Sequence, residues 1–210
     1  MDKHDLEMPL VAILRGLAPA EALDVGAALF EAGFRMLEVP LNRPGAVECI
    51  ARLARHAPAG VLVGGGTMLT ADDVRAVHAA GGRLMVAPNC DVEVIRLAAG
   101  MDMFCAPGVA TPTEAFRAIA AGAHALKLFP AEMIGMAGLK AMKSVLPPGM
   151  PLWPVGGIKP DSMADWLKAG ASGFGIGGAL YTPGMTPAEV GARARAYVEA
   201  WRSALNRGQA

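Results

Sequence analysis

The stretch Glu31-Ala32-Gly33-Phe34-Arg35-Met36-Leu37-Glu38-Val39-Pro40 contains the end of a helix followed by a strand. Gly33 stands where a helix needs a left-handed residue to end it. The residues after Gly33 are mostly apolar on consecutive positions, as in a strand that is covered on both faces. Similar phrases recur at Ala121-Gly122-Ala123 and at Lys168-Ala169-Gly170-Ala171. The recurrence indicates a β/α unit that the chain uses repeatedly.

Eight such units can be followed along the chain. The expected strands are Pro9–Leu14, Arg35–Pro40, Val61–Gly65, Leu84–Ala87, Met103–Ala106, Ala125–Phe129, Leu152–Val155 and Gly173–Gly177. Helices are expected to start near Pro19, Gly45, Thr70, Asp91, Thr113, Met136, Asp161 and Thr186, with Thr70, Asp161 and Thr186 as N-caps and with Gly33, Gly82, Gly122 and Gly170 ending helices. No Pro- or Ser-rich linker interrupts the series. We therefore predict a single (β/α)8 TIM barrel domain over residues 1–210, with a short N-terminal extension at residues 1–8; an open doubly wound sheet is the alternative.

Composition narrows the class of partner. The chain has 210 residues, of which 53% are hydrophobic and 18% charged, and its 19 basic residues balance 19 acidic ones without a run of either sign. This is not the charge pattern of a nucleic-acid or membrane-surface binder, so we expect a small-molecule partner. The three cysteines are well separated and the histidines are dispersed, which predicts neither disulfides nor a metal site. The polar, acidic start and the lack of a long apolar run favour a soluble cytoplasmic protein.

Lys127 is the most informative single residue. It lies in Ala123-His124-Ala125-Leu126-Lys127-Leu128-Phe129-Pro130, an apolar run that ends at a proline. Lysine is rarely buried without a partner, and burial favours the neutral amine, which is a nucleophile. The alternative is that Lys127 lies at the end of the strand and extends its charged group into water.

Two further ionisable residues lie near strand ends. Glu38 is a carboxylate within the apolar strand that ends at Pro40, and Arg15 directly follows the first strand. Active-site groups of barrels come from the C-terminal ends of strands, so we expect Lys127, Glu38 and Arg15 to share one pocket. A structural ion pair between Glu38 and Lys127, with Arg15 on the surface, is the alternative, although burying a pair for stability alone is often unfavourable.

Glycines predict an anion site. Gly156 and Gly157 follow the seventh strand, and Gly177 and Gly178 follow the eighth. Backbone without a side chain allows close approach of an anion, and barrels often hold a phosphate at these two loops. Thr67 follows three glycines at the end of the third strand and either donates to a ligand carboxylate or caps the next turn.

A desolvated lysine with a nearby carboxylate and without a metal suggests Schiff-base chemistry on a carbonyl substrate. Five segments carry a family resemblance: Ala12-Ile13-Leu14-Arg15-Gly16, Leu37-Glu38-Val39-Pro40-Leu41-Asn42, Gly64-Gly65-Gly66-Thr67, Leu126-Lys127-Leu128-Phe129-Pro130-Ala131-Glu132 and Val155-Gly156-Gly157-Ile158. Together they resemble the class I 2-keto-3-deoxy-6-phosphosugar-acid aldolases, from about residue 8 to residue 202. A phosphosugar isomerase or epimerase on the same barrel, and a non-catalytic assembly module, are the competing interpretations.

The resemblance implies a homotrimer of barrels that cleaves a phosphorylated six-carbon keto-sugar acid to pyruvate and glyceraldehyde 3-phosphate without a cofactor. It implies that Lys127 forms the Schiff base and that Glu38 is the general acid and base. It also implies that Thr67 and Phe129 contact the pyruvate end, and that the phosphate is held by the backbone of the four glycines Gly156, Gly157, Gly177 and Gly178.

Two sister activities of this family differ in the configuration at C4 of the substrate. The galactonate-derived type resembles this chain more, because Asn42 and Val155 stand where the gluconate-derived type has Arg and Thr. The resemblance then implies that Arg15 binds the substrate; the gluconate-derived epimer as main or additional substrate is the alternative. Gly178 departs from the pattern, which has Ser there, and so removes a possible hydroxyl contact to phosphate.

Overall fold

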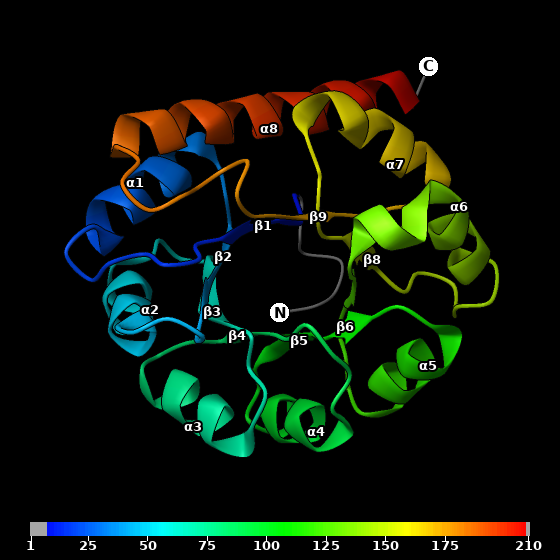
Figure 1. Ribbon diagram of the computed structural model, residues 1–210, viewed down its shortest axis with the longest axis horizontal. Coiled ribbons are helices and arrows are strands. Elements are labelled where there is room, and N and C mark those ends of the chain that lie inside the picture. The colour runs from blue at the N-terminus through cyan, green and yellow to red at the C-terminus, as the bar shows by residue number, and fades with distance from the viewer. Residues whose placement is uncertain (1–7, 209–210) are drawn as a thin grey trace.

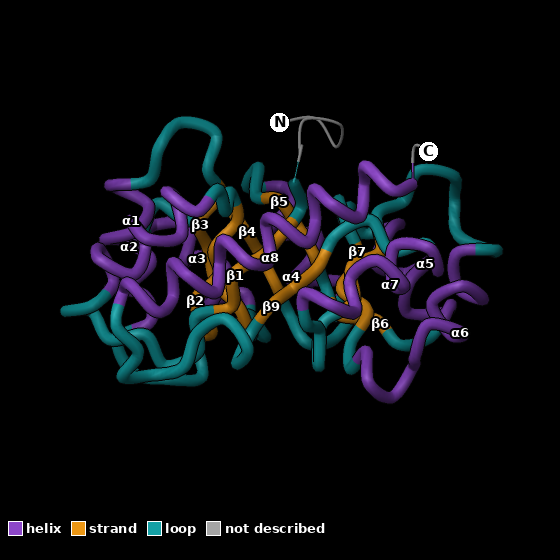
Figure 2. The backbone as a smooth tube through the Cα atoms, turned by 90° about the horizontal axis from the view of Figure 1, so that it is seen from above, coloured by secondary structure: helices purple, strands orange, loops and turns teal. Residues whose placement is uncertain are grey.

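The computed structural model describes residues 8–208, with side chains as far as residue 206. Within that range, parallel strands surround a central axis and helices form the outer ring (Figure 1). Seen from the side, the strands are the inner layer and helices flank them (Figure 2). Of the N-terminal extension expected at residues 1–8, only Met8 lies within the described residues.

The strands match the eight predicted ones to within one residue at each end, and one short strand is additional. They are β1 (Leu10–Ile13), β2 (Met36–Pro40), β3 (Leu62–Gly66), β4 (Leu84–Val86), β5 (Phe104–Ala106), β6 (Gly108–Val109), β7 (Leu126–Leu128), β8 (Leu152–Pro154) and β9 (Phe174–Ile176). The predicted fifth strand is followed by the separate β6, because Pro107 lacks the backbone N–H that would continue the ladder. β5 and β6 together take one place in the barrel.

The pairing closes the barrel. One parallel sheet has the order β5-β4-β3-β2-β1-β9, and the other has the order β6-β7-β8. A bridge between Val155 and Gly175 joins β8 to β9, and the backbone of residues 124 and 125 bonds to the carbonyl of Cys105 on the other side. Both outer strands of the larger sheet therefore have neighbours. The barrel prediction is confirmed, and the doubly wound alternative is wrong.

The helices follow the strands in the predicted alternation. They are α1 (Ala22–Ala32), α2 (Ala46–His56), α3 (Ala71–Ala79), α4 (Val92–Gly100), α5 (Pro112–Ala120), α6 (Ala131–Lys143), η1 (Pro160–Ser162), α7 (Met163–Ala169) and α8 (Pro187–Gly208). Thr70 and Thr186 accept hydrogen bonds from the N–H groups three residues on, as N-caps do. The long α8 lies across α1 and α7 (Figure 1).

Four details of the helix ends differ from the prediction. Asp161 is no N-cap, because it lies inside η1, where Ser162 bonds to the backbone of residue 159 instead. Gly81, with φ of 88°, takes the left-handed position expected of Gly82, which packs closely on Val77. α1 begins at Ala22 rather than near Pro19. α6 begins five residues before Met136, and its first turn is separated from the rest by non-helical dihedrals at Gly135.

The core has two parts, and the smaller one explains the position of the polar residues. The larger cluster joins the strands to the helices. The smaller one fills the barrel interior with residues contributed mainly by the strands, among them Met36, Phe104 and Trp153. Side chains two residues apart on a strand share a face. Glu38 follows Met36 at that spacing, and Lys127 follows the buried Ala125, so both point inward one layer nearer the strands' C-terminal ends.

Candidate active site

Lys127 lies in the middle of β7 with only 8% of its surface exposed. Its Nζ is 5.0 Å from the centroid of the Phe129 ring. The alternative in which Lys127 extends into water is therefore wrong. Burial lowers the pKa of the Lys127 amine; the nearby Glu38 carboxylate opposes this shift, and the Arg15 charge adds to it. A lowered pKa increases the fraction of neutral, nucleophilic amine at neutral pH.

Glu38 lies on β2 and is 1% exposed. Its Oε2 has no hydrogen-bond partner among the described residues. Burial raises the pKa of Glu38 from 4.5 to about 7, against the opposing effects of Lys127 and Arg15. The ion pairs found between described residues are all exposed pairs within helices, so Glu38 and Lys127 form no structural ion pair. Glu38 is instead a buried carboxyl group that both gains and loses a proton near neutral pH.

The glycines of β3 make room for protein atoms rather than for a ligand. A Cβ at Gly66 would overlap the Glu38 carboxylate, and a Cβ at Gly64 would overlap the backbone of Leu84. Gly66 therefore allows Glu38 to lie in the barrel interior. Thr67 then adopts a φ of 55°, which is strained for a β-branched residue and is typical of functional sites.

A cavity of about 510 Å³ opens at the C-terminal ends of the strands. Its wall includes nine of the ten predicted site residues: Arg15, Thr67, Lys127, Phe129, Val155, Gly156, Gly157, Gly177 and Gly178. Glu38 is the exception, because it lines a smaller pocket inside the barrel. The two pockets share Lys127 and Val155, so Glu38 lies on the inner side of the same wall. Segments far apart in sequence thus meet around Lys127.

The four glycines of the predicted anion site have different environments. Gly156 and Gly157 have φ values of 117° and 63°, which favour glycine. The Glu132 carboxylate group lies on the side where their Cβ atoms would be. By contrast, Gly177 and Gly178 have φ values outside that region, and nothing lies within 4 Å of a Cβ placed at Gly178.

Sequence reasoning missed several residues of the wall. Glu132, Lys159, Tyr181 and Thr182 also line the cavity. Glu132 stood within one of the motif segments, whereas Thr182 lies in the loop between β9 and α8, where the sequence carries no signal. Tyr181 is buried, and its hydroxyl donates to the Glu21 carboxylate over 3.4 Å.

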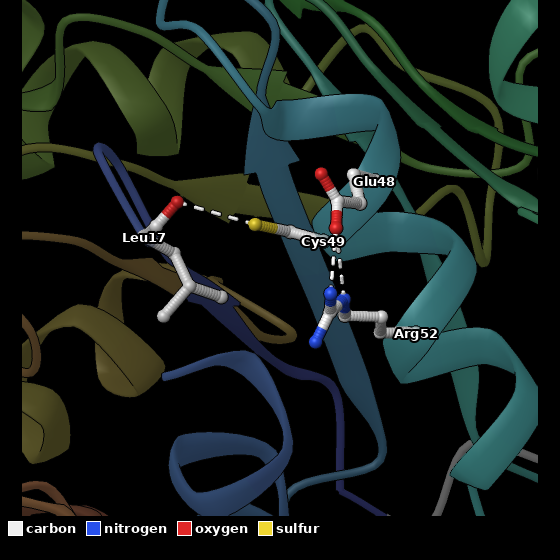
Figure 3. A network of polar contacts seen from close by, with 4 residues as sticks. All are labelled: Leu17, Glu48, Cys49 and Arg52. Carbon is white, nitrogen blue, oxygen red and sulfur yellow. Dashed lines mark hydrogen bonds and ion pairs between the residues drawn. The ribbon is translucent and has the colours of Figure 1, made fainter. Parts of the chain in front are cut away.

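The loop that carries Arg15 is fixed from outside the barrel. The Cys49 thiol on α2 donates a hydrogen bond to the carbonyl of Leu17 over 3.2 Å (Figure 3). The exposed pair Glu48–Arg52 lies on the same helix at 2.7 Å. Arg15 is exposed, as the alternative with Arg15 on the surface expects. It nevertheless lines the cavity together with Lys127.

Over the described range, the His, Cys, Asp and Glu side chains form no cluster of three that would hold a metal ion. In the same range, no helix is long and apolar enough to cross a membrane.

Comparison with known proteins fits this geometry. The model of the family described as KDPG and KHG aldolase matches residues 2–196. This chain belongs to that family. Aldolases of the family are carbon–carbon lyases of class I, which work through a Schiff base and in general without a metal. Membership excludes the isomerase or epimerase and the assembly module as interpretations of the barrel.

Individual members of the family are similar over nearly the whole chain. A probable 2-dehydro-3-deoxy-6-phosphogalactonate aldolase of Rhizobium meliloti (strain 1021) is 47% identical over 93% of this chain and 92% of its own. The 2-dehydro-3-deoxy-6-phosphogalactonate aldolase of Escherichia coli (strain K12) is 42% identical over 95% of this chain and 97% of its own. A solved structure described as native KDPGal superposes with a TM-score of 0.94 at 41% identity, covering 98% of this chain and all of the other.

Proposed function

We propose that this protein is a class I aldolase that cleaves 2-dehydro-3-deoxy-6-phosphogalactonate to pyruvate and glyceraldehyde 3-phosphate. The observation that carries the proposal is that two buried side chains, Lys127 and Glu38, line one inner pocket, while Lys127 also lines the main cavity. The lowered pKa of Lys127 makes the amine available, and the pKa of Glu38 near 7 suits a group that takes up a proton and returns it.

Carbon–carbon cleavage follows from these two roles. The neutral Lys127 amine attacks the C2 ketone, and the resulting carbinolamine takes up a proton and loses water to give an iminium ion. The Glu38 carboxylate takes the proton of the C4 hydroxyl, the C3–C4 bond breaks, and its electron pair moves to the iminium nitrogen. Glyceraldehyde 3-phosphate leaves, and an enamine remains on Lys127. The iminium is thus the electron sink that makes the cleavage possible.

Glu38 then completes the cycle. The protonated carboxyl group gives its proton to C3 of the enamine, which regenerates an iminium ion, now of pyruvate. Water adds to that iminium, pyruvate leaves, and the Lys127 amine is free again after release of the proton that the first iminium took up. Proton transfer by a positioned group of this kind accelerates a step by roughly 10²–10⁴-fold.

The remaining residues of the cavity wall are assigned to two different ends of the substrate. We assign the keto acid end to Thr67, Phe129 and Arg15, because Phe129 lies under the Lys127 amine and the charge of Arg15 acts on both buried groups. We assign the phosphate to the backbone at Gly156, Gly157, Gly177 and Gly178, because these glycines line the same cavity.

Val155 supports the galactonate-derived epimer over the gluconate-derived one. It is 7% exposed and lines both the cavity and the inner pocket, which supports a role for this apolar side chain beside the reacting carbons. A valine cannot donate a hydrogen bond to a C4 hydroxyl, whereas a threonine can. The names of the two relatives described above point to the same epimer.

Four other expectations stay predictions: the single domain over residues 1–210, the homotrimer, the cytoplasmic location and the independence from metals. Phe116 on α5 and Met133 on α6 are 46% and 83% exposed, which supports a subunit interface near these helices.

Borohydride reduction in the presence of pyruvate tests the Schiff base. We expect one pyruvyl adduct by mass spectrometry, located on Lys127 and lost in Lys127→Ala. Lys168→Ala is the matched control, because Lys168 is exposed on α7, where it pairs with Asp165. An adduct that survives Lys127→Ala would exclude the mechanism. Cleavage rates on the two epimeric phospho acids then test substrate choice, and faster cleavage of the gluconate form would overturn the assignment.

A further inference from the structure

A carboxylate lies beside the Gly156–Gly157 backbone, to which the phosphate is assigned. Backbone N–H groups are neutral donors, and the nearest ionisable group is the Glu132 carboxylate, which lies against both glycines. The Glu132 side chain makes no hydrogen bond or ion pair with any residue of the described range, so no cation there neutralises it directly. A phosphate dianion at these glycines would meet a like charge, which disfavours binding unless a cation also contributes.

Three basic side chains line the described cavity: Arg15, Lys127 and Lys159. The first two act electrostatically on Glu38 and belong to the keto acid end. Lys159 is therefore the cation of this wall that remains for the opposite end of the substrate.

Lys159 is well placed for this role. It follows Gly156-Gly157-Ile158 directly in the chain and lies in the wall that the cavity shares with an adjoining pocket. Its side chain is exposed and makes no ion pair with another described residue, so its charge is free for a ligand. Gly178 lines the same cavity, and nothing lies within 4 Å of a Cβ placed there.

We propose that the Lys159 ammonium binds the phosphate of the substrate and offsets the Glu132 charge beside the glycine pair. The inference rests on the proposed function, because it takes the phosphorylated keto-sugar acid as ligand. Lys159 is a binding residue and not a catalytic one: it acts on the end of the substrate that does not react. Its charge-assisted hydrogen bond is stronger than a bond from a neutral donor.

The test compares Lys159→Met with wild type on two substrates. We expect KM for the 6-phospho acid to rise about 10-fold, because one charged hydrogen bond to the ligand is lost. Activity on the same keto acid without phosphate, and the pyruvyl adduct on Lys127, should be unchanged. Lys168→Met, an exposed lysine away from the cavity, is the control. An unchanged KM for the phospho acid, or an equal loss on both substrates, would overturn the inference.

Glu132→Gln gives an independent readout with the opposite sign. Removing the like charge should lower the inhibition constant of inorganic phosphate, and Lys159→Met should raise it. If Glu132→Gln and Lys159→Met change the inhibition constant of phosphate in the same direction, the proposal is wrong. If wild type forms no pyruvyl adduct, the proposed function is wrong. If the adduct forms and the inhibition constant of phosphate is the same in Lys159→Met as in wild type, only this inference is wrong.

Discussion

The Glu38 carboxylate fills the space that a side chain at position 66 would need: a Cβ added to Gly66 would overlap it. The two residues lie on paired neighbouring strands, with Gly66 at the end of β3 and Glu38 in β2. The buried carboxyl group therefore depends on a glycine that does not itself line the cavity.

Gly66→Ala should displace the Glu38 carboxylate and lower kcat by about 100-fold, within the range of a lost proton-transfer group. Overpacking should also cost about 1–3 kcal/mol of folding free energy. Steady-state cleavage and thermal unfolding check the two effects, while the pyruvyl adduct on Lys127 should still form. Gly100→Ala is the control, because nothing lies within 4 Å of a Cβ there and its φ is ordinary. An active Gly66→Ala enzyme would show that the position of Glu38 is not critical.

The raised pKa of Glu38 predicts a pH-dependent stability difference. Between pH 4.5 and about 7 the folded protein keeps a proton that the unfolded chain releases, so the contribution of Glu38 to stability falls as the pH rises through this window. A shift of this size corresponds to about 3 kcal/mol. Wild type should therefore lose about that much relative to Glu38→Gln between pH 4 and pH 8.

Urea unfolding of wild type and of Glu38→Gln across this pH range measures how the difference in their free energies of unfolding changes with pH. Any cost of the amide that does not depend on pH drops out of this change. Glu114→Gln is a control of opposite sign, because hydrogen bonds from the backbone at Ala110 and from Thr111 lower the pKa of Glu114. The stabilising effect of the Glu114 carboxylate in wild type should disappear as the pH falls. A flat difference for Glu38→Gln would show that the carboxyl group titrates normally.

The sequence predicted the barrel and most of the cavity wall for a physical reason. Strand and helix periods are local, and the ends of parallel strands must meet at one face, so Lys127, Arg15 and Gly156 could be placed together from spacing alone. The position of Glu132 against the glycine pair was not predictable, because it depends on how the first turn of α6 leaves β7 before the break at Gly135. Likewise, only three-dimensional packing shows that Gly66 makes room for Glu38.

Arg15 should tune Lys127 through charge. The guanidinium contributes to lowering the pKa of the Lys127 amine, so Arg15→Met should raise that pKa. The rate of pyruvyl adduct formation should then reach half its maximum at a higher pH than in wild type. Arg43→Met is the control: Arg43 lines a separate surface pocket beside Arg15 and does not line the cavity. An unchanged pH midpoint in Arg15→Met would show that Arg15 acts by contact with substrate alone.

Val155 should decide between the two epimers. Its backbone is fixed by hydrogen bonds to Leu128 and Ala131, so Val155→Thr should change the side chain's chemistry without moving the strand. The new hydroxyl can bond to the C4 hydroxyl of the gluconate-derived substrate, and one neutral hydrogen bond is worth about 1 kcal/mol. The ratio of kcat/KM values for the two epimers should therefore shift about 5-fold toward the gluconate form. Val155→Ala is the control, because it removes apolar volume and adds no donor. If alanine shifts the ratio as much as threonine does, shape rather than hydrogen bonding sets the stereopreference, and the role assigned to Val155 is wrong.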